Sequence, residues 1–169
     1  MSCLKCTCGC EKRSKEELQQ VLDATDKPDV FIKNPIAQEM FKKFIDPEEP
    51  GVYQASASQP RIKRRPNAIK YLEFMQMAHH LRNNSNEAEN NKFAEDIDPD
   101  LGDELMDANE KLAKVLTETE ENDHPELMEA NKNRAEVLQK IVEDYGNKLK
   151  VSPEFKNFVA KLSETYKKM

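Results

Sequence analysis

The sequence has 169 residues, a length that suits one domain and a terminal tail. Hydrophobic residues make up 37% of it and charged residues 34%, so we expect a modest core and a strongly charged surface. The net charge of −6 argues against a nucleic-acid-binding role, because binding to phosphates requires clustered basic side chains. No run of about 20 apolar residues is present, which argues against a membrane-spanning segment.

Residues that favour helices dominate the composition, while the four glycines and the absence of tryptophan argue against a β fold. The predicted fold class is therefore all-α, a compact multi-helix bundle. We expect a flexible Cys-rich tail at residues 1–13 and a helical domain at residues 14–169. A long loop is expected at residues 46–66, which contain four prolines.

All four cysteines lie in the first ten residues, interleaved with basic ones: Cys3, Cys6, Cys8 and Cys10. Thiols in a basic tail are typical of proteins that are S-acylated. Two or more acyl chains hold a protein stably at a bilayer, and basic residues add attraction to anionic lipid. We therefore predict lipidation of these cysteines. The alternatives are a thiolate site for zinc or copper(I) and an unmodified tail.

Local sequence signals predict where most helices begin. The segment Ser14-Lys15-Glu16-Glu17 fits a capping box before the first helix, which is expected to end at residues 26–28. Four later helices are expected to begin at a polar residue followed by proline. Proline has no backbone N–H group, and the first position of a helix does not need one. These pairs are Asn34-Pro35, Asp98-Pro99, His124-Pro125 and Ser152-Pro153. We expect Ile36 and Leu116 on buried faces, and the helix from Pro125 to end at Gly146.

The stretch NAIKYLEFMQMAHHLR at residues 67–82 is the most apolar part of the chain. One helical face carries Ile69, Leu72, Met75 and Ala78, and a second carries Phe74, Met77 and Leu81. A helix that is apolar on two sides is usually buried on two sides. We therefore predict that this is the central helix of the bundle.

A basic run directly precedes this helix and consists of Arg61, Lys63, Arg64 and Arg65 around Ile62. We predict that this run, together with Asn67, contacts a protein partner or anionic lipid. The alternative is a solvated linker.

Residues 95–123 are strongly acidic, with twelve carboxylates and two lysines. A calcium loop starting at Asp96 is one interpretation. An EF-hand, however, needs glycine at its sixth position, where this chain has Leu101. A solvated acidic helix is the preferred interpretation, and no metal site or cofactor is predicted. No nucleophile with a base at recognisable spacing and no Gly-rich phosphate loop is present, so no catalytic residue is predicted either.

Two segments resemble the RGS (regulator of G-protein signalling) homology family: VFIKNPIAQEMFKKFI at residues 30–45 and AIKYLEFMQMAHHLR at residues 68–82. The positions that match the family pattern are Phe41, Phe44, Ile45, Leu72, Phe74 and Met75, with Met75 where the family usually has tryptophan. The run at residues 134–159 is similar to the family's closing pattern of a helix, a short linker and a final helix. In some members a string of palmitoylated cysteines precedes the domain.

This resemblance implies an all-α bundle that binds the GTP-bound α subunit of a heterotrimeric G protein. Active members speed GTP hydrolysis by steadying the switch loops of the α subunit, without a catalytic side chain of their own. Two features of the family are missing here. The loop before the central helix lacks the family's Glu-Asn pair, and residues 96–103 are acidic where the family's second contact loop carries an asparagine.

We therefore expect a cytoplasmic signalling protein at the inner face of a membrane, tethered by acylated cysteines. Its expected partner is a G-protein α subunit or another signalling protein, and it is not expected to be an enzyme. It is predicted to bind the α subunit and accelerate its GTP hydrolysis. The alternative is a non-enzymatic, membrane-tethered helical adaptor.

The lipidation hypothesis predicts that changing Cys3, Cys6, Cys8 and Cys10 together to serine moves the protein from the membrane fraction to the soluble fraction of cells. The physical reason is that the acyl chains supply most of the membrane affinity. Fractionation followed by immunoblotting measures the distribution, and Ser2→Ala serves as a control that leaves every thiol in place. Unchanged membrane association of the quadruple variant would contradict the hypothesis.

Overall fold

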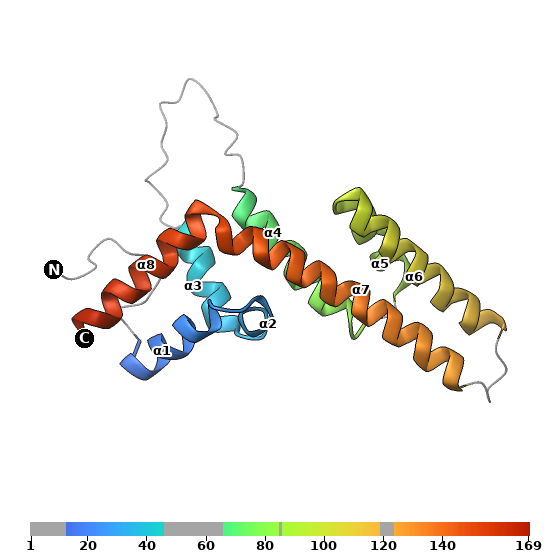
Figure 1. Cartoon of the computed structure of the whole chain (residues 1–169), viewed down its shortest axis with the longest axis horizontal. Helices are drawn as coiled ribbons and strands as arrows, with labels where there is room; N and C mark the ends of the chain where they lie inside the picture. The colour runs from blue at the N-terminus through green and yellow to red at the C-terminus, as the bar shows by residue number, and fades with distance from the viewer. Residues whose placement is uncertain (1–12, 46–65, 85, 119–123) are drawn as a thin grey trace, which may run out of the picture. The chain divides into compact units, whose positions relative to one another are not determined.

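The computed structural model describes residues 13–45, 66–84, 86–118 and 124–169. These residues form helices and contain no strand, which confirms the all-α prediction for this part of the chain (Figure 1). The helices are α1 (Lys15–Ala24), α2 (Pro28–Phe31), α3 (Pro35–Ile45), α4 (Asn67–Leu81), α5 (Glu87–Asp96), α6 (Pro99–Glu118), α7 (His124–Val151) and α8 (Pro153–Lys168). Residues 1–12 of the predicted tail and 46–65 of the predicted loop lie outside the described residues.

The helix starts follow the local signals of the sequence. The Ser14 hydroxyl accepts a hydrogen bond from the backbone N–H of Glu17 at 3.2 Å, and the Glu17 carboxylate accepts one from the Ser14 N–H at 3.1 Å. This reciprocal pair is the predicted capping box. Helices α3, α6 and α8 begin at the predicted prolines, and α7 begins one residue earlier than expected, at His124. The short α2 was not predicted, because a single turn is too short to show a periodic apolar pattern.

The prediction that the seventh helix ends at Gly146 is wrong, because α7 continues to Val151. Glycine inside a helix costs about 1 kcal/mol relative to alanine. Leu149 lies almost one turn further along and is 2% exposed. Burying a leucine side chain contributes roughly 1.5–3 kcal/mol, which offsets the cost of the glycine. The helix ends instead where Ser152 and Pro153 begin the next one, and the Ser152 hydroxyl accepts a hydrogen bond from the Phe155 N–H.

Three side chains expected in the interior are exposed: Ile36 (40%), Met77 (42%) and Leu116 (57%). Each lies four positions from a buried residue, respectively Met40, Leu81 and Leu112, so helical periodicity alone does not distinguish them from the core. Along α4, Leu72, Met75 and Ala78 are fully buried, whereas Phe74 is only partly buried. The central helix therefore buries one face fully and the second face only in part.

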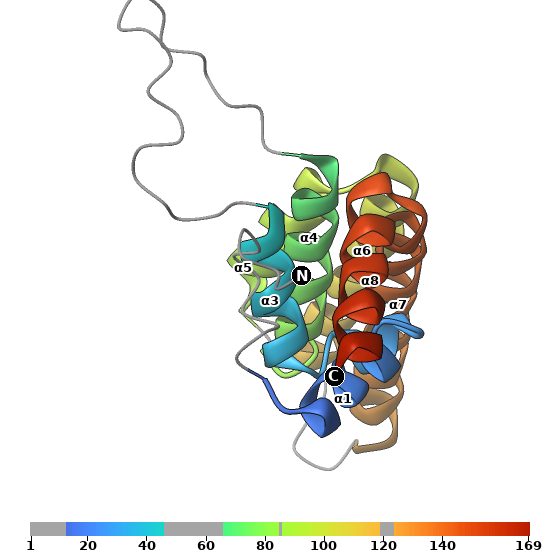
Figure 2. The same ribbon diagram turned by 90° about the vertical axis from the view of Figure 1, so that its left-hand side faces the viewer.

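The chain divides into two compact units. The first comprises residues 1–72 and 146–169, and its described part contains α1, α2, α3, α8 and one end each of α4 and α7. Both α1 and α3 pack against α8 (Figure 2). The ring centroids of Phe31 and Phe41 each lie 5.3 Å from that of Phe155, and Phe41 also packs against Phe158 at 5.3 Å. This aromatic cluster joins α2, α3 and α8 and forms the centre of the first unit's core.

The second unit comprises residues 73–145, which include α5, α6 and the remaining parts of α4 and α7. The Tyr145 ring lies 4.9 Å from the Phe74 ring, and the latter lies 6.2 Å from the Phe93 ring. The Tyr145 hydroxyl accepts a hydrogen bond from the backbone N–H of Asp98 at 2.9 Å. Tyr145 therefore links the C-terminal half of α7 to the connection between α5 and α6.

Helices α5 and α6 lie side by side (Figure 1), and Gly102 allows their close approach. A Cβ atom at Gly102 would lie 2.3 Å from the carbonyl oxygen of Ala94, far inside van der Waals contact. Because that oxygen belongs to the backbone, it cannot rotate away. The glycine is thus needed for packing, although it weakens the helix locally.

We predict that Gly102→Ala destabilises the protein by about 1–3 kcal/mol, because α5 and α6 have to move apart. At an unhindered helical position the same change would stabilise by roughly 1 kcal/mol, so the sign of the effect is diagnostic. Urea unfolding followed by circular dichroism measures the difference. Asp103→Ala, at the exposed neighbouring position, is the control, and a stabilising Gly102→Ala would show that the helices are not in contact there.

Candidate functional site: a pocket at a buried arginine

Most of the predicted site residues lie outside the described part of the chain: Cys3, Cys6, Cys8, Cys10, Arg61, Lys63, Arg64 and Arg65. Asn67 is described and is the exposed first residue of α4. The carbonyl of Pro66, just before it, accepts the hydrogen bond of the Ile69 N–H at 3.1 Å. The Asn67 side chain is therefore available at the start of a rigid helix.

The stretch considered as a calcium loop is largely helical. Asp96 ends α5, and α6 starts at Pro99, with Leu101 and Gly102 buried in its first turns. Asp100, Asp103 and Asp107 are therefore spread along a helix instead of converging. No group of three or more His, Cys, Asp or Glu side chains that could hold a metal ion occurs among the described residues. None of the helices within the described ranges is both long and apolar enough to cross a bilayer.

The most unusual side chain of the second unit is Arg134 on α7, which is 5% exposed. It lies on the helical face that continues through Leu138 and Ile141, both fully buried. Long charged side chains are rarely buried unless they are paired. The sequence carried a signal for this residue, because Arg134 occupies a position of the apolar stripe of α7, but sequence reasoning did not identify it.

The guanidinium of Arg134 makes two hydrogen bonds to neutral acceptors. Its Nη1 donates to Asn90 Oδ1 at 2.7 Å, and its Nη2 donates to the backbone carbonyl of Asn84 at 3.4 Å. Asn90 is 2% exposed and is itself held by donation to the carbonyls of Asn84 and Asn86. The first bond is short and links α7 to α5. The second is long and therefore weak.

Arg134 Nε is buried and has no hydrogen-bond partner within the described chain. The same side chain takes part in no ion pair there, since the paired cations are lysines. Burial lowers the pKa of the Arg134 guanidinium from its usual value. Arginine nevertheless stays protonated in proteins, so the group is a buried cation without a carboxylate partner among these residues.

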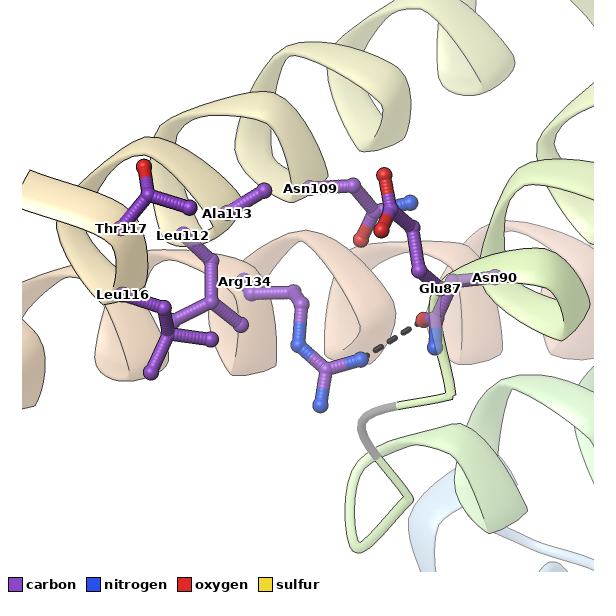
Figure 3. A pocket seen from close by; sticks show the side chains of 8 residues that line it. All are labelled: Glu87, Asn90, Asn109, Leu112, Ala113, Leu116, Thr117 and Arg134. Atoms are coloured by element: carbon purple, nitrogen blue, oxygen red, sulfur yellow. Dashed lines mark hydrogen bonds between the residues drawn. The ribbon is translucent and has the colours of Figure 1, made fainter.

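A pocket of about 190 Å³ opens beside this guanidinium (Figure 3). Helix α5 contributes Glu87 and Asn90, and α7 contributes Arg134. The wall formed by α6 consists of Asn109, Leu112, Ala113, Leu116 and Thr117. Leu112 is buried and Leu116 is exposed, so the apolar side of the pocket runs from the interior to the surface. All eight lining residues belong to the second unit.

A larger hollow, of about 640 Å³, lies between α6 and α7. Its polar lining is mixed in charge, with lysines on α6 and on α7 and glutamates on α7: Lys111, Lys114, Lys132, Glu126, Glu129 and Glu136. All six residues are exposed. This hollow therefore resembles a solvated groove between two helices, and it concentrates no single charge.

Comparisons with protein-family models, with curated proteins and with solved structures found no match. Inference about function therefore depends on this chain's own residues.

We predict that Asn90→Ala destabilises the protein by about 2–3 kcal/mol, because it removes the best acceptor of a buried charged group. In an Arg134→Met background the cost is expected to fall by at least about 1 kcal/mol, since the charge that needs the acceptor is gone. Urea unfolding of the four members of this double-mutant cycle measures the coupling. Lys92→Ala, at an exposed position of α5, is the control. Equal costs of Asn90→Ala in both backgrounds would mean that the Arg134–Asn90 bond contributes nothing.

Proposed function

We propose that this chain is a signalling module without an active site of its own, which binds the GTP-bound α subunit of a heterotrimeric G protein. The observation that carries the proposal is the position of the residues on which the family resemblance depends. Phe41, Leu72 and Met75 are fully or almost fully buried, in helices α3 and α4. The matched segments thus form helices in which these three positions are buried, while the matched Phe44, Ile45 and Phe74 are partly buried.

The C-terminal part of the chain supports the same proposal. The resemblance implies a helix, a short linker and a final helix at residues 134–159. In this protein α7 and α8 are separated by Ser152 alone, and Phe155 and Phe158 at the start of α8 are buried. The order of α7 and α8 and the burial of Phe155 and Phe158 therefore agree with the closing pattern of the family.

The expected contact surface includes the start of α4. Asn67 is exposed there and is separated from the basic run at residues 61–65 by Pro66 alone. An exposed amide on a rigid helix end can donate to and accept from backbone groups of a partner. Basic residues beside it would speed association with an acidic partner surface and make that association dependent on salt. Acylation of the N-terminal cysteines would confine the module to a bilayer, where a membrane-bound partner is concentrated.

The mechanism of such a module is stabilisation by contact. The α subunit carries its own catalytic groups, and a bound partner lowers the barrier to hydrolysis only if it favours the transition-state arrangement of the switch loops. Binding the ground state and the transition state equally would give a complex without acceleration.

A second candidate function, an adaptor that binds without acceleration, is favoured by the chemistry of residues 96–103. The family's second contact loop carries an asparagine, whereas this stretch presents the exposed carboxylates Asp98, Asp100 and Asp103. A carboxylate is only an acceptor, so it cannot replace the donor function of an amide. The regulator and the adaptor are therefore both expected to bind the α subunit, but only the regulator is expected to increase the rate of GTP hydrolysis.

We expect the protein to bind immobilised α subunits loaded with GDP and aluminium fluoride, a mimic of the transition state, more tightly than the GDP form. A panel of α-subunit classes is tested by biolayer interferometry, and single-turnover GTP hydrolysis is measured in parallel. Asn67→Ala is expected to weaken binding roughly tenfold, a typical effect for a central contact residue. Lys70→Ala, exposed one turn further along α4, is the matched control and is expected to have little effect.

Binding together with faster hydrolysis supports the regulator, and binding with an unchanged rate supports the adaptor. If no α subunit binds in either nucleotide state, the proposal of a G-protein module is wrong.

A further inference from the structure

We propose that the pocket beside Arg134 is a binding site for a carboxylate with a short apolar portion, supplied either by a small organic acid or by an acidic side chain of a peptide. This inference does not depend on the proposed G-protein partner. Every residue that lines the pocket lies between positions 87 and 134, and Asn67 takes no part in it.

The charge of the buried Arg134 side chain points to an anionic ligand. A cation transferred from water to a protein interior loses favourable hydration, and an anion in contact with it normally compensates. Arg134 is 5% exposed, and its two acceptors, Asn90 Oδ1 and the Asn84 carbonyl, are neutral. The described chain supplies no carboxylate to this guanidinium. A bound anion would complete the site.

The N–H donors of Arg134 have a geometry that suits a carboxylate. A guanidinium carries five N–H groups in a planar fork, and the Nε–H and one Nη2–H point in parallel from the same edge. At Arg134, Nη1 is engaged at 2.7 Å, whereas Nε has no acceptor and Nη2 has only a 3.4 Å contact. Arg134 lines the pocket, so a carboxylate can approach the Nη2 side of the guanidinium, where donor capacity remains, whereas Nε lies buried beneath the pocket surface.

The lining of the pocket suits a ligand with a short apolar portion. Leu112, Ala113 and Leu116 present an apolar wall beside the guanidinium (Figure 3). Asn109 Nδ2 makes one long hydrogen bond, 3.4 Å to Asn91, and so retains capacity to donate. Liquid water occupies roughly 30 Å³ per molecule, so a pocket of about 190 Å³ admits a ligand of only a few heavy atoms. A carboxylate with a chain of two or three methylene groups fits this combination.

The rim of the pocket favours a single negative charge. Glu87 lies at the opening and is exposed, so a ligand meets one buried cation and one nearby anion. A phosphate carries up to two charges at neutral pH, and Glu87 repels it more strongly than it repels a carboxylate. The site is therefore expected to prefer a monocarboxylate over inorganic phosphate.

The test uses the full chain labelled with ¹⁵N and follows the Arg134 Nε–H signal and the side-chain amides of Asn90 and Asn109 by NMR. Sodium butyrate, N-acetylglutamate amide and inorganic phosphate are titrated separately at constant ionic strength. Saturable shifts of these three signals by butyrate, by the glutamate derivative or by both support the site. The acid that saturates at the lower concentration identifies the source of the carboxylate. Phosphate is expected to bind at least tenfold more weakly.

Two variants separate binding from folding. Arg134→Met is expected to abolish saturation, while Lys132→Gln, which removes an exposed cation from the same helix, leaves it unchanged. Leu116 is 57% exposed at the pocket wall, so Leu116→Glu should fold normally. The new carboxylate is expected to weaken butyrate binding at least tenfold, whereas Leu116→Gln weakens it far less.

Non-saturating shifts with both acids, equal binding by Arg134→Met, or phosphate binding as tight as that of butyrate would each overturn the proposal. None of these results bears on G-protein binding, which the interferometry experiment measures separately.

Discussion

The hydrogen bonds of Arg134 join α7 to two neighbouring segments of the second unit that lie far from it in sequence. From α7 the guanidinium reaches Asn90 on α5 and the carbonyl of Asn84, which follows the end of α4. Hydrogen bonds to a charged group are stronger than those between neutral groups, and they need defined geometry. A hydrophobic side chain at position 134 would fill the space without specifying this arrangement. The buried cation therefore defines how α5 and the α4–α5 connection meet α7.

Arg134 is buried because α5, α6 and α7 pack closely against one another in this unit. Gly102 lets α6 approach the end of α5, and Tyr145 ties the α5–α6 connection to α7 through the Asp98 N–H. With α5, α6 and α7 held in this way, the arginine lies beneath a wall formed by Leu112 and Leu116. The pocket is thus a product of helix packing, since each helix contributes only one part of it.

The two candidate binding regions differ in their chemistry. The start of α4 offers an exposed amide next to a basic run, a combination that suits a protein or membrane surface. The Arg134 pocket is small, partly apolar and built around one buried charge, and these properties suit a small ligand or a single side chain.

Local chemistry made much of the helical fold predictable. Capping by Ser14, Asn34 and Ser152 and the prolines that follow polar residues depend on neighbours within four positions, and they correctly located helix starts. The apolar face predicted for residues 67–82 is likewise buried, at Ile69, Leu72, Met75 and Ala78. The candidate site, in contrast to the helix starts, could not be located from local sequence signals. The sequence suggested Asn67, which proved exposed, whereas the pocket at Arg134 was not predicted at all.

Tertiary contacts determined the remaining features, because their causes lie far along the chain. Gly146 lies inside a helix since the burial of Leu149 outweighs its local preference, and Leu116, in the last turn of α6, is 57% exposed although its apolar side chain suggested burial. Arg134 and Asn90 are 44 positions apart. No local pattern connects them, so only the packed structure could show that an arginine in an apolar stripe is a buried cation with donors still unused.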